Sequence, residues 1–139
     1  MNLVNANTIC RAALERGREL GLKPLTVAVL DPGGHLIVLA REDGASNLRP
    51  QIAIGKASGA LGLGVSSRKV GEMAAERPTF IAALAEIAPQ GLIPVAGGVL
   101  VTDQAGGLIG AVGVTGDTSD NDEICALAGI AAAGLAGKA

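Results

Sequence analysis

Aromatic residues are almost absent from this chain of 139 residues, which contains one Phe and no Tyr or Trp. Because 49% of the residues are nevertheless hydrophobic, the core has to be built from Val, Ile, Leu and Ala. The 21 glycines allow backbones to approach one another closely. Small side chains of this kind favour wide, close-packed helix faces, so the composition predicts a homo-oligomer.

Long apolar runs and paired cysteines are also missing. No apolar run reaches the roughly 18 residues of a membrane-spanning helix. The N-terminus lacks the basic segment and apolar core of a secretion signal. Cys10 and Cys125 show no CxxC or other metal-type spacing. These absences predict a cytoplasmic protein with two reduced, buried thiols and no membrane partner.

Basic residues are scarce in the second half of the chain. Residues 1–77 hold ten Lys or Arg against seven Asp or Glu, whereas residues 78–139 hold one against six. Without a basic stripe or stacking aromatic residues, no nucleic-acid partner is expected. The single histidine, His35, excludes a His-rich metal site, and no metal site is predicted. There is also no His–Asp–Ser order to indicate a hydrolase triad. We interpret His35 as a solvent-facing turn residue.

The hydrophobic pattern predicts one domain, residues 1–139, with two β-hairpins between helices. Helices are expected over 3–20, from about Pro50 to 64, over 66–76, over 78–89, and from about Ser119 to the end of the chain. Strands are expected over 25–31 and 35–43, around the turn Asp31–His35, and over 98–103 and 107–116. Because hairpins cannot supply a parallel βαβ sheet, the order predicts an α+β fold with an antiparallel sheet of four to five strands flanked by helices.

Four carboxylates cluster in the stretch GDTSDNDE, which precedes the last predicted helix. Ser119 is predicted as the N-cap, with Asp122 three residues later as in a capping box. Carboxylates in a first helical turn also interact well with the positive end of the helix. Helix capping does not account for all four acids. We expect the others to face Arg41 and Lys56 across a cleft.

Two cations and three glycines are further candidates for a site. Arg41, at a strand end, has the geometry to clamp a carboxylate, and Lys56 lies among small residues, either snorkelling to solvent or standing in a cleft. Glycines inside a helix cost about 1 kcal/mol each relative to Ala. Gly55, Gly59 and Gly62 on one side of a helix therefore require a packing reason, namely a sheet, another helix or a flat ligand.

Three stretches, in order, resemble the motifs of the GlcG/HbpS family of haem-degrading or haem-binding domains, which is similar to the C-terminal domain of PduO. They are VAVLDPGGHLIVLAREDGA, IAIGKASGALGLG, and the run from PVAGGVLVTD to GDTSDNDEICALAGIAAAG. The resemblance implies a profilin-like arrangement, homo-oligomers, and haem or a related tetrapyrrole as ligand. The usual types of axial ligand in this chain are His35, Met73 and the two cysteines.

Three hypotheses for function remain open at this point. The first is a small-ligand-binding homo-oligomer, with haem as a possible cofactor and with ligand-binding residues Lys56, Gly55, Gly59, Thr115 and Asp117. The second is an enzyme of small organic acid catabolism. In it, Arg41 or Lys56 holds the substrate carboxylate and one of Asp117, Asp120 or Glu123 transfers a proton. The third is a scaffold without a ligand.

Overall fold

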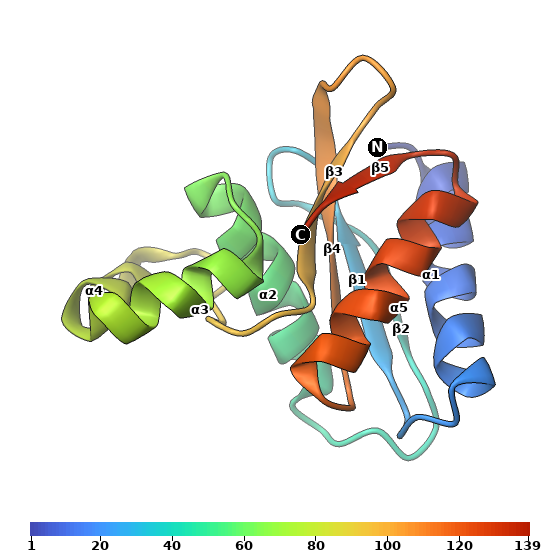
Figure 1. Ribbon diagram of the computed structural model, residues 1–139, viewed down its shortest axis with the longest axis horizontal. Coiled ribbons are helices and arrows are strands. Elements are labelled where there is room, and N and C mark those ends of the chain that lie inside the picture. The colour runs from blue at the N-terminus through green and yellow to red at the C-terminus, as the bar shows by residue number, and fades with distance from the viewer.

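The computed structural model describes residues 1–139 as one sheet with helices on both faces (Figure 1). The helices are α1 (Leu3–Glu19), α2 (Arg49–Leu63), α3 (Ser67–Glu76), α4 (Pro78–Ile87) and α5 (Ser119–Ala132). The strands are β1 (Thr26–Leu30), β2 (Leu36–Arg41), β3 (Gly98–Thr102), β4 (Leu108–Thr115) and β5 (Ala136–Lys138). All pairs are antiparallel, in the order β2-β1-β4-β3-β5, which confirms the predicted α+β fold.

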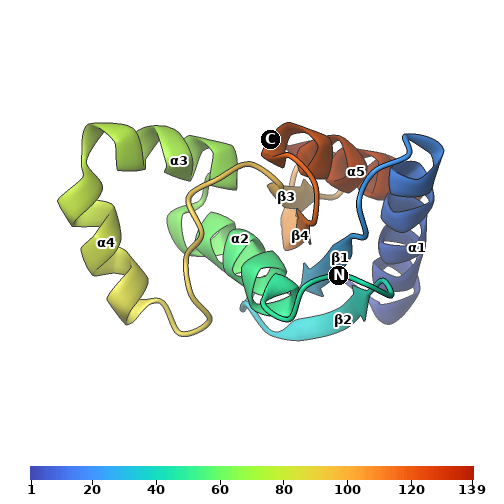
Figure 2. The same cartoon turned by 90° about the horizontal axis from the view of Figure 1, so that it is seen from below.

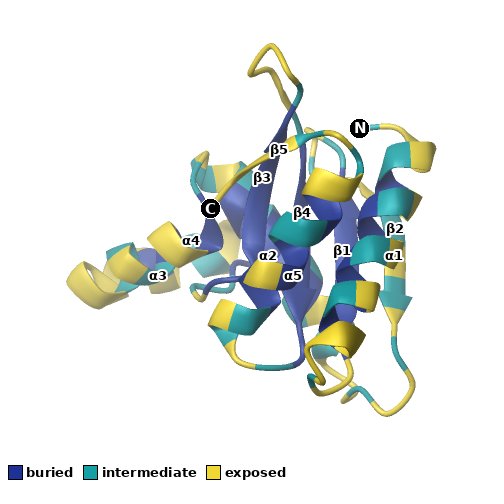
Figure 3. Cartoon of the chain, turned by 45° about the vertical axis from the view of Figure 1, so that its right-hand side comes forward, coloured by how far each residue is buried: buried dark blue, intermediate teal, exposed yellow.

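The two faces of the sheet are covered differently. Helices α1 and α5 pack side by side on one face, α2 lies on the other, and α3 and α4 extend away from the sheet on the side of α2 (Figures 1 and 2). The main core is the valine-rich layer between the sheet and the pair α1–α5, where Cys10 and Cys125 are also buried and unpaired. Figure 3 shows the central strands β1, β3 and β4 largely buried, and the edge strand β5 and much of α4 exposed. No helix has the length and apolar character to cross a membrane.

Helix α2 approaches the sheet closely because two sheet residues beneath it have no side chain. Gly98 and Gly113 are register partners on β3 and β4. A Cβ on Gly113 would lie 1.9 Å from the carbonyl oxygen of Ala53, and one on Gly98 would lie 2.3 Å from that of Lys56. The close contact with the sheet thus rests on glycines of the sheet itself.

Both predicted hairpins form, and their turns are built alike. In the first, the Oδ1 atom of Asp31 accepts hydrogen bonds from the backbone N–H groups of Gly33 and His35, both at 2.9 Å. In the second, Asp103 accepts in the same way from Ala105 at 2.9 Å and Gly107 at 2.8 Å. The same five-residue turn therefore closes with His at its last position in one hairpin and Gly in the other.

The C-terminal region differs from the prediction at both ends of α5. The N-cap is Thr118, whose Oγ1 accepts from the N–H of Asn121 at 3.3 Å, and not Ser119. The expected helix to the end of the chain is wrong, because Gly134 adopts a left-handed φ of 70° just beyond α5. The following residues form β5, which pairs with β3 at the edge of the sheet.

Candidate functional site

A buried ion pair joins α2 to α5. The Lys56 Nζ donates to Asp122 Oδ2 and to the carbonyl oxygen of Val114, both at 2.9 Å. Both charged side chains are only 2% exposed. Burial lowers the pKa of Lys56 and raises that of Asp122, while the attraction between the two groups opposes both shifts. The acidic loop does meet Lys56, but through Asp122, which was predicted to cap the helix, and not through the other acids. The contact lies inside the protein and not across an open cleft.

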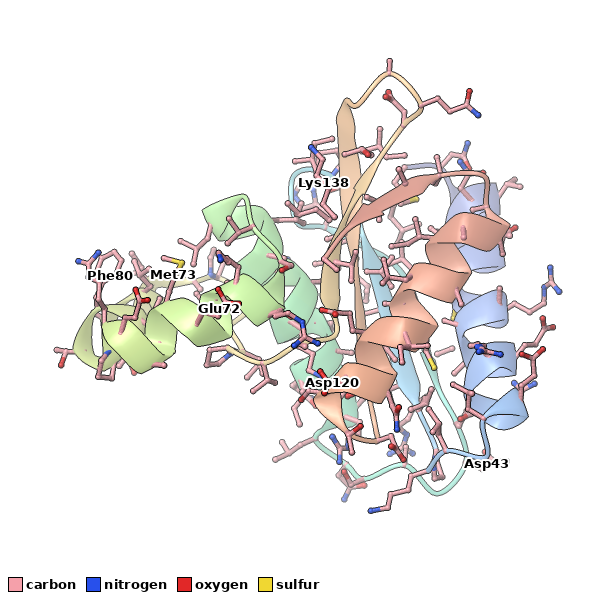
Figure 4. The ribbon with its side chains drawn as sticks, viewed as in Figure 1. Asp43, Glu72, Met73, Phe80, Asp120 and Lys138 are labelled. Atoms are coloured by element: carbon pink, nitrogen blue, oxygen red, sulfur yellow. The ribbon has the colours of Figure 1, made fainter.

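Two further acids of the loop, the exposed Asp120 and the buried Glu123, meet a cation that the sequence did not point to. Arg68, on α3, donates from Nε to the Glu123 carboxylate at 3.0 Å and from a terminal nitrogen to Asp120. Figure 4 shows Asp120 at the start of α5, on the side facing α3. These two carboxylates raise the pKa of Arg68. The cluster therefore ties the α3–α4 pair to the body of the protein.

Asp117 organises the loop before α5. Its carboxylate accepts from the side-chain amide of Asn121 at 2.7 Å and from the backbone N–H groups of Thr118 at 2.9 Å and Lys23 at 3.1 Å. These hydrogen bonds, led by that from Asn121, lower the pKa of Asp117 to about 2. The neighbouring candidate Thr115 is buried and its hydroxyl accepts from Arg49 at 2.8 Å.

The structure does not bring Arg41 to the acidic loop. Its guanidinium contacts the carbonyl oxygen of Ala45 at 3.5 Å. It lines a polar hollow together with Arg18, Glu42 and Asp43. The expectation that the acids face Arg41 is therefore wrong, because Lys56 and Arg68 occupy that place. Catalytic roles for Arg41, Asp120 and Glu123 stay predictions.

The candidate glycines of α2 have two kinds of surroundings. A Cβ on Gly55 would lie 2.7 Å from Ile93, and one on Gly59 would lie 3.1 Å from Leu92. Both glycines therefore make room for the chain segment before β3, which is the packing reason for Gly55, while Gly59 also lines the cavity described next. A Cβ on Gly62 would meet nothing within 4 Å.

That open space belongs to a cavity of about 540 Å³. It is bounded by α2, the end of α4 with the segment that follows, and the turn between β1 and β2. Its lining is Pro32, Gly33, Gly34, His35, Ser58, Gly59, Leu61, Gly62, Leu63, Leu84, Ile87, Ala88, Pro89, Gln90 and Leu92. The side chain of Gln90 donates to the carbonyl oxygen of Gly34, which closes one edge of the cavity. The volume lies within the range of about 300–1,000 Å³ that is usual for small-molecule sites.

His35 is the one residue of this lining with metal-ligand chemistry. Its side chain is 80% exposed, and its Nδ1 lies 3.1 Å from both carboxylate oxygens of Asp31. This hydrogen bond places the proton of a neutral imidazole on Nδ1 and leaves the lone pair of Nε2 free. The prediction that His35 is a solvent-facing turn residue is confirmed, whereas nothing in the sequence pointed to the cavity beside it. The one local signal in the sequence was Asp31, four residues before His35, whose carboxylate holds the imidazole.

Elsewhere, no group of three or more His, Cys, Asp or Glu side chains is arranged to hold a metal ion. The buried Cys125 is not a reactive thiol, because burial raises its pKa to about 11.

Comparison with known proteins identifies relatives over nearly the whole chain. No curated protein sequence matches. Among solved structures, the crystal structure of HbpS is 33% identical, with a TM-score of 0.81, covering 94% of this chain and 88% of that one. The Klebsiella pneumoniae protein ORFY is 25% identical, with a TM-score of 0.85 and coverage of 96% and 90%. A complex of PduOC with haem, at 22% identity, shares the fold with a TM-score of 0.87, covering 100% of this chain and 99% of that one.

The family model described as haem degrading protein HbpS-like matches residues 1–131. Since this match spans most of the chain, the protein belongs to the HbpS-like family.

Proposed function

We propose that the protein binds haem or a closely related metallated tetrapyrrole in the cavity between α2, α4 and the β1–β2 turn. The observation that carries this proposal is His35, which lines an apolar cavity of about 540 Å³ and whose Nδ1 lies within hydrogen-bond distance of Asp31. Imidazole is a standard axial ligand of haem iron. Haem would supply a redox-active iron, and the chain would supply its ligand and its apolar surroundings.

The donor set and the lining of the cavity fit such a ligand. Leu61, Leu63, Leu84, Ile87 and Leu92 offer aliphatic surface to a flat ring. No Lys or Arg lines the cavity, so the propionates of haem would stay in water. Membership of a haem-related family and 33% identity to HbpS support the same ligand class.

A competitive titration tests the proposal. Haemin is added to the purified protein in the presence of excess albumin, and the Soret band is followed by absorbance. We expect a saturable shift that persists against albumin. A featureless titration of the wild-type protein would contradict the proposal.

A matched pair of variants then locates the site. Gly62→Leu fills the cavity without a backbone clash, because nothing lies within 4 Å of the added Cβ. Ala82→Leu adds similar bulk on the exposed surface of α4, outside the cavity. We expect Gly62→Leu to weaken haemin binding at least about tenfold and Ala82→Leu to leave it unchanged. Equal haemin affinities for the two variants would show that haemin does not bind in this cavity.

We also propose that the protein is a homo-oligomer. The support is the composition, together with large apolar side chains left exposed in the single chain, such as Ile87 at 76% and Val4 at 74%.

A further inference from the structure

Arg49, the first residue of α2, is a half-buried cation without an acidic partner. Its guanidinium donates to the Thr115 hydroxyl at 2.8 Å and forms no ion pair. The charge of Arg49 acts on the buried pair beside it, but the oxygens of Asp122 are already occupied by Lys56 and by the backbone N–H of Asp117. Burial lowers the pKa of Lys56, and the positive charge of Arg49 lowers it further. The surroundings of Arg49 therefore hold one uncompensated positive charge.

A buried hydroxyl without a partner lies next to Thr115 on the sheet. Thr26 on β1 stands opposite Arg41 of β2 on one side and opposite Thr115 of β4 on the other. Directly opposite residues share one face of a sheet, and here it is the face covered by α2, since Gly113 lies beneath Ala53. The Thr26 hydroxyl is fully buried and has no hydrogen-bond partner. Because buried hydroxyls are nearly always paired, this one indicates a water or a ligand atom at this end of the sheet.

The start of α2 also lacks a negatively charged or capping group. Its N-cap residue, Leu48, provides no side-chain hydrogen bond, and the first turn contains no acid. The free N–H groups and positive end of such a helix attract anions. The unpaired guanidinium, the unpartnered hydroxyl and the uncapped helix thus have the same chemical requirement, which is a negatively charged oxygen.

We propose that the start of α2 is a binding site for a small monocarboxylate, which is held by the guanidinium of Arg49 above Thr26 and Thr115. A guanidinium matches the geometry of a carboxylate with two parallel hydrogen bonds. A monoanion balances the single unpaired charge, whereas a phosphate would bring a second negative charge toward Asp117 and Asp122. The site is separate from the cavity at His35, whose α2 lining begins only at Ser58.

Acetate is the probe for the test, with binding to the whole protein followed by saturation-transfer NMR at constant ionic strength. We expect a saturable signal in the wild type and an affinity at least about tenfold lower in Arg49→Gln. Arg11→Gln changes the net charge equally in an exposed pair on α1 and should bind acetate as the wild type does. Equal affinities in all three proteins, or no binding to the wild type, would overturn the proposal. Stronger competition by inorganic phosphate than by formate would overturn the carboxylate class.

Thermal unfolding separates ligand binding from a structural role of Arg49. Gln keeps a donor for the Thr115 hydroxyl and removes only the charge. In chloride, Arg49→Gln should therefore have the same midpoint as the wild type or a higher one. Replacing chloride by acetate should raise the midpoint of the wild type alone. A lower midpoint in the variant, with no effect of acetate on the wild type, would show that Arg49 serves folding only.

An acid of a second copy is the competing source of the counter-charge. In that case Arg49→Gln would lower the sedimentation coefficient and the wild type would not bind acetate. That combination would overturn the monocarboxylate site.

Discussion

At the scale of single residues, the least tolerant position is the buried Lys56. Replacing it by Met would leave the Asp122 carboxylate inside the protein without its cation. Breaking a buried pair in this way costs about 3–5 kcal/mol. We therefore expect Lys56→Met to lower the free energy of unfolding by several kcal/mol in urea denaturation.

The matched control is Lys69→Met, which removes a lysine from the exposed pair with Glu72 at 2.6 Å. Exposed pairs contribute about 0–1 kcal/mol, so this change should be nearly neutral. If the two Lys→Met variants were equally stable, the ion pair at Asp122 would not support the junction of α2 and α5.

Asp117 makes the free energy of unfolding depend on pH in the acid range. Its folded pKa of about 2 lies below the unfolded value of 3.8, so the native state binds fewer protons in this range. The contribution is fully present above pH 4 and is lost as the pH falls toward 2. The stability difference between the wild type and Asp117→Asn, measured by urea denaturation across this range, should therefore shrink on acidification. A difference independent of pH would contradict this account.

At the scale of elements, two glycines differ in whether an added Cβ would meet other atoms: Gly113 on β4 has no room for one, and Gly62 on α2 has. Gly113→Ala would drive a Cβ to 1.9 Å from a backbone oxygen of α2, which cannot move aside as a side chain can. Gly62→Ala meets nothing and improves helix propensity by up to about 1 kcal/mol. We expect thermal unfolding to show a lower midpoint for Gly113→Ala and an equal or higher one for Gly62→Ala. The reverse order would contradict the placement of α2.

Local signals in the sequence were sufficient for most elements. The Asp31–His35 turn, the β-branched strands and Gly21 after the first helix each carry a local physical cause. The strand β5 has no such cause, because Ala136–Lys138 becomes extended only by pairing with β3. Ser119 and Thr118 are both competent caps, and the sequence does not decide between them.

The candidate site was harder to predict than the fold because its walls are distant in sequence. The link between Lys56 and the acidic loop was found because both features are unusual in composition. The cavity at His35 needs the end of α4, more than 45 residues later, to fold back onto the turn. No periodicity or spacing encodes that contact, and Arg68, which anchors α3 to α5, was hidden in the same way.

At the scale of the whole molecule, the charge around the cavity predicts how binding responds to salt. Without Lys or Arg in the lining, haemin affinity should change less than about twofold between roughly 0.05 and 0.5 M NaCl, since no ion pair is screened. Gln90→Lys adds a cation at the rim and should make binding tighter and sensitive to salt. Strong salt dependence in the wild type would place the propionates on a different surface.

Association is the second property of the whole molecule. The chain mass is 13.7 kDa, and we expect sedimentation velocity to give a species of a small multiple of that mass. A single monomeric boundary at all concentrations would contradict the homo-oligomer.

The Asp-anchored turn closes equally well with His or Gly at its last position, and this has a consequence for ligand chemistry. Changing the residue at that position adds or removes an imidazole, while the hydrogen bonds that anchor the turn come from the backbone and the Asp in both hairpins. The backbone of this turn therefore leaves the choice of side chain at its last position open. A shared fold then constrains the backbone structure more than it constrains which ligand is bound.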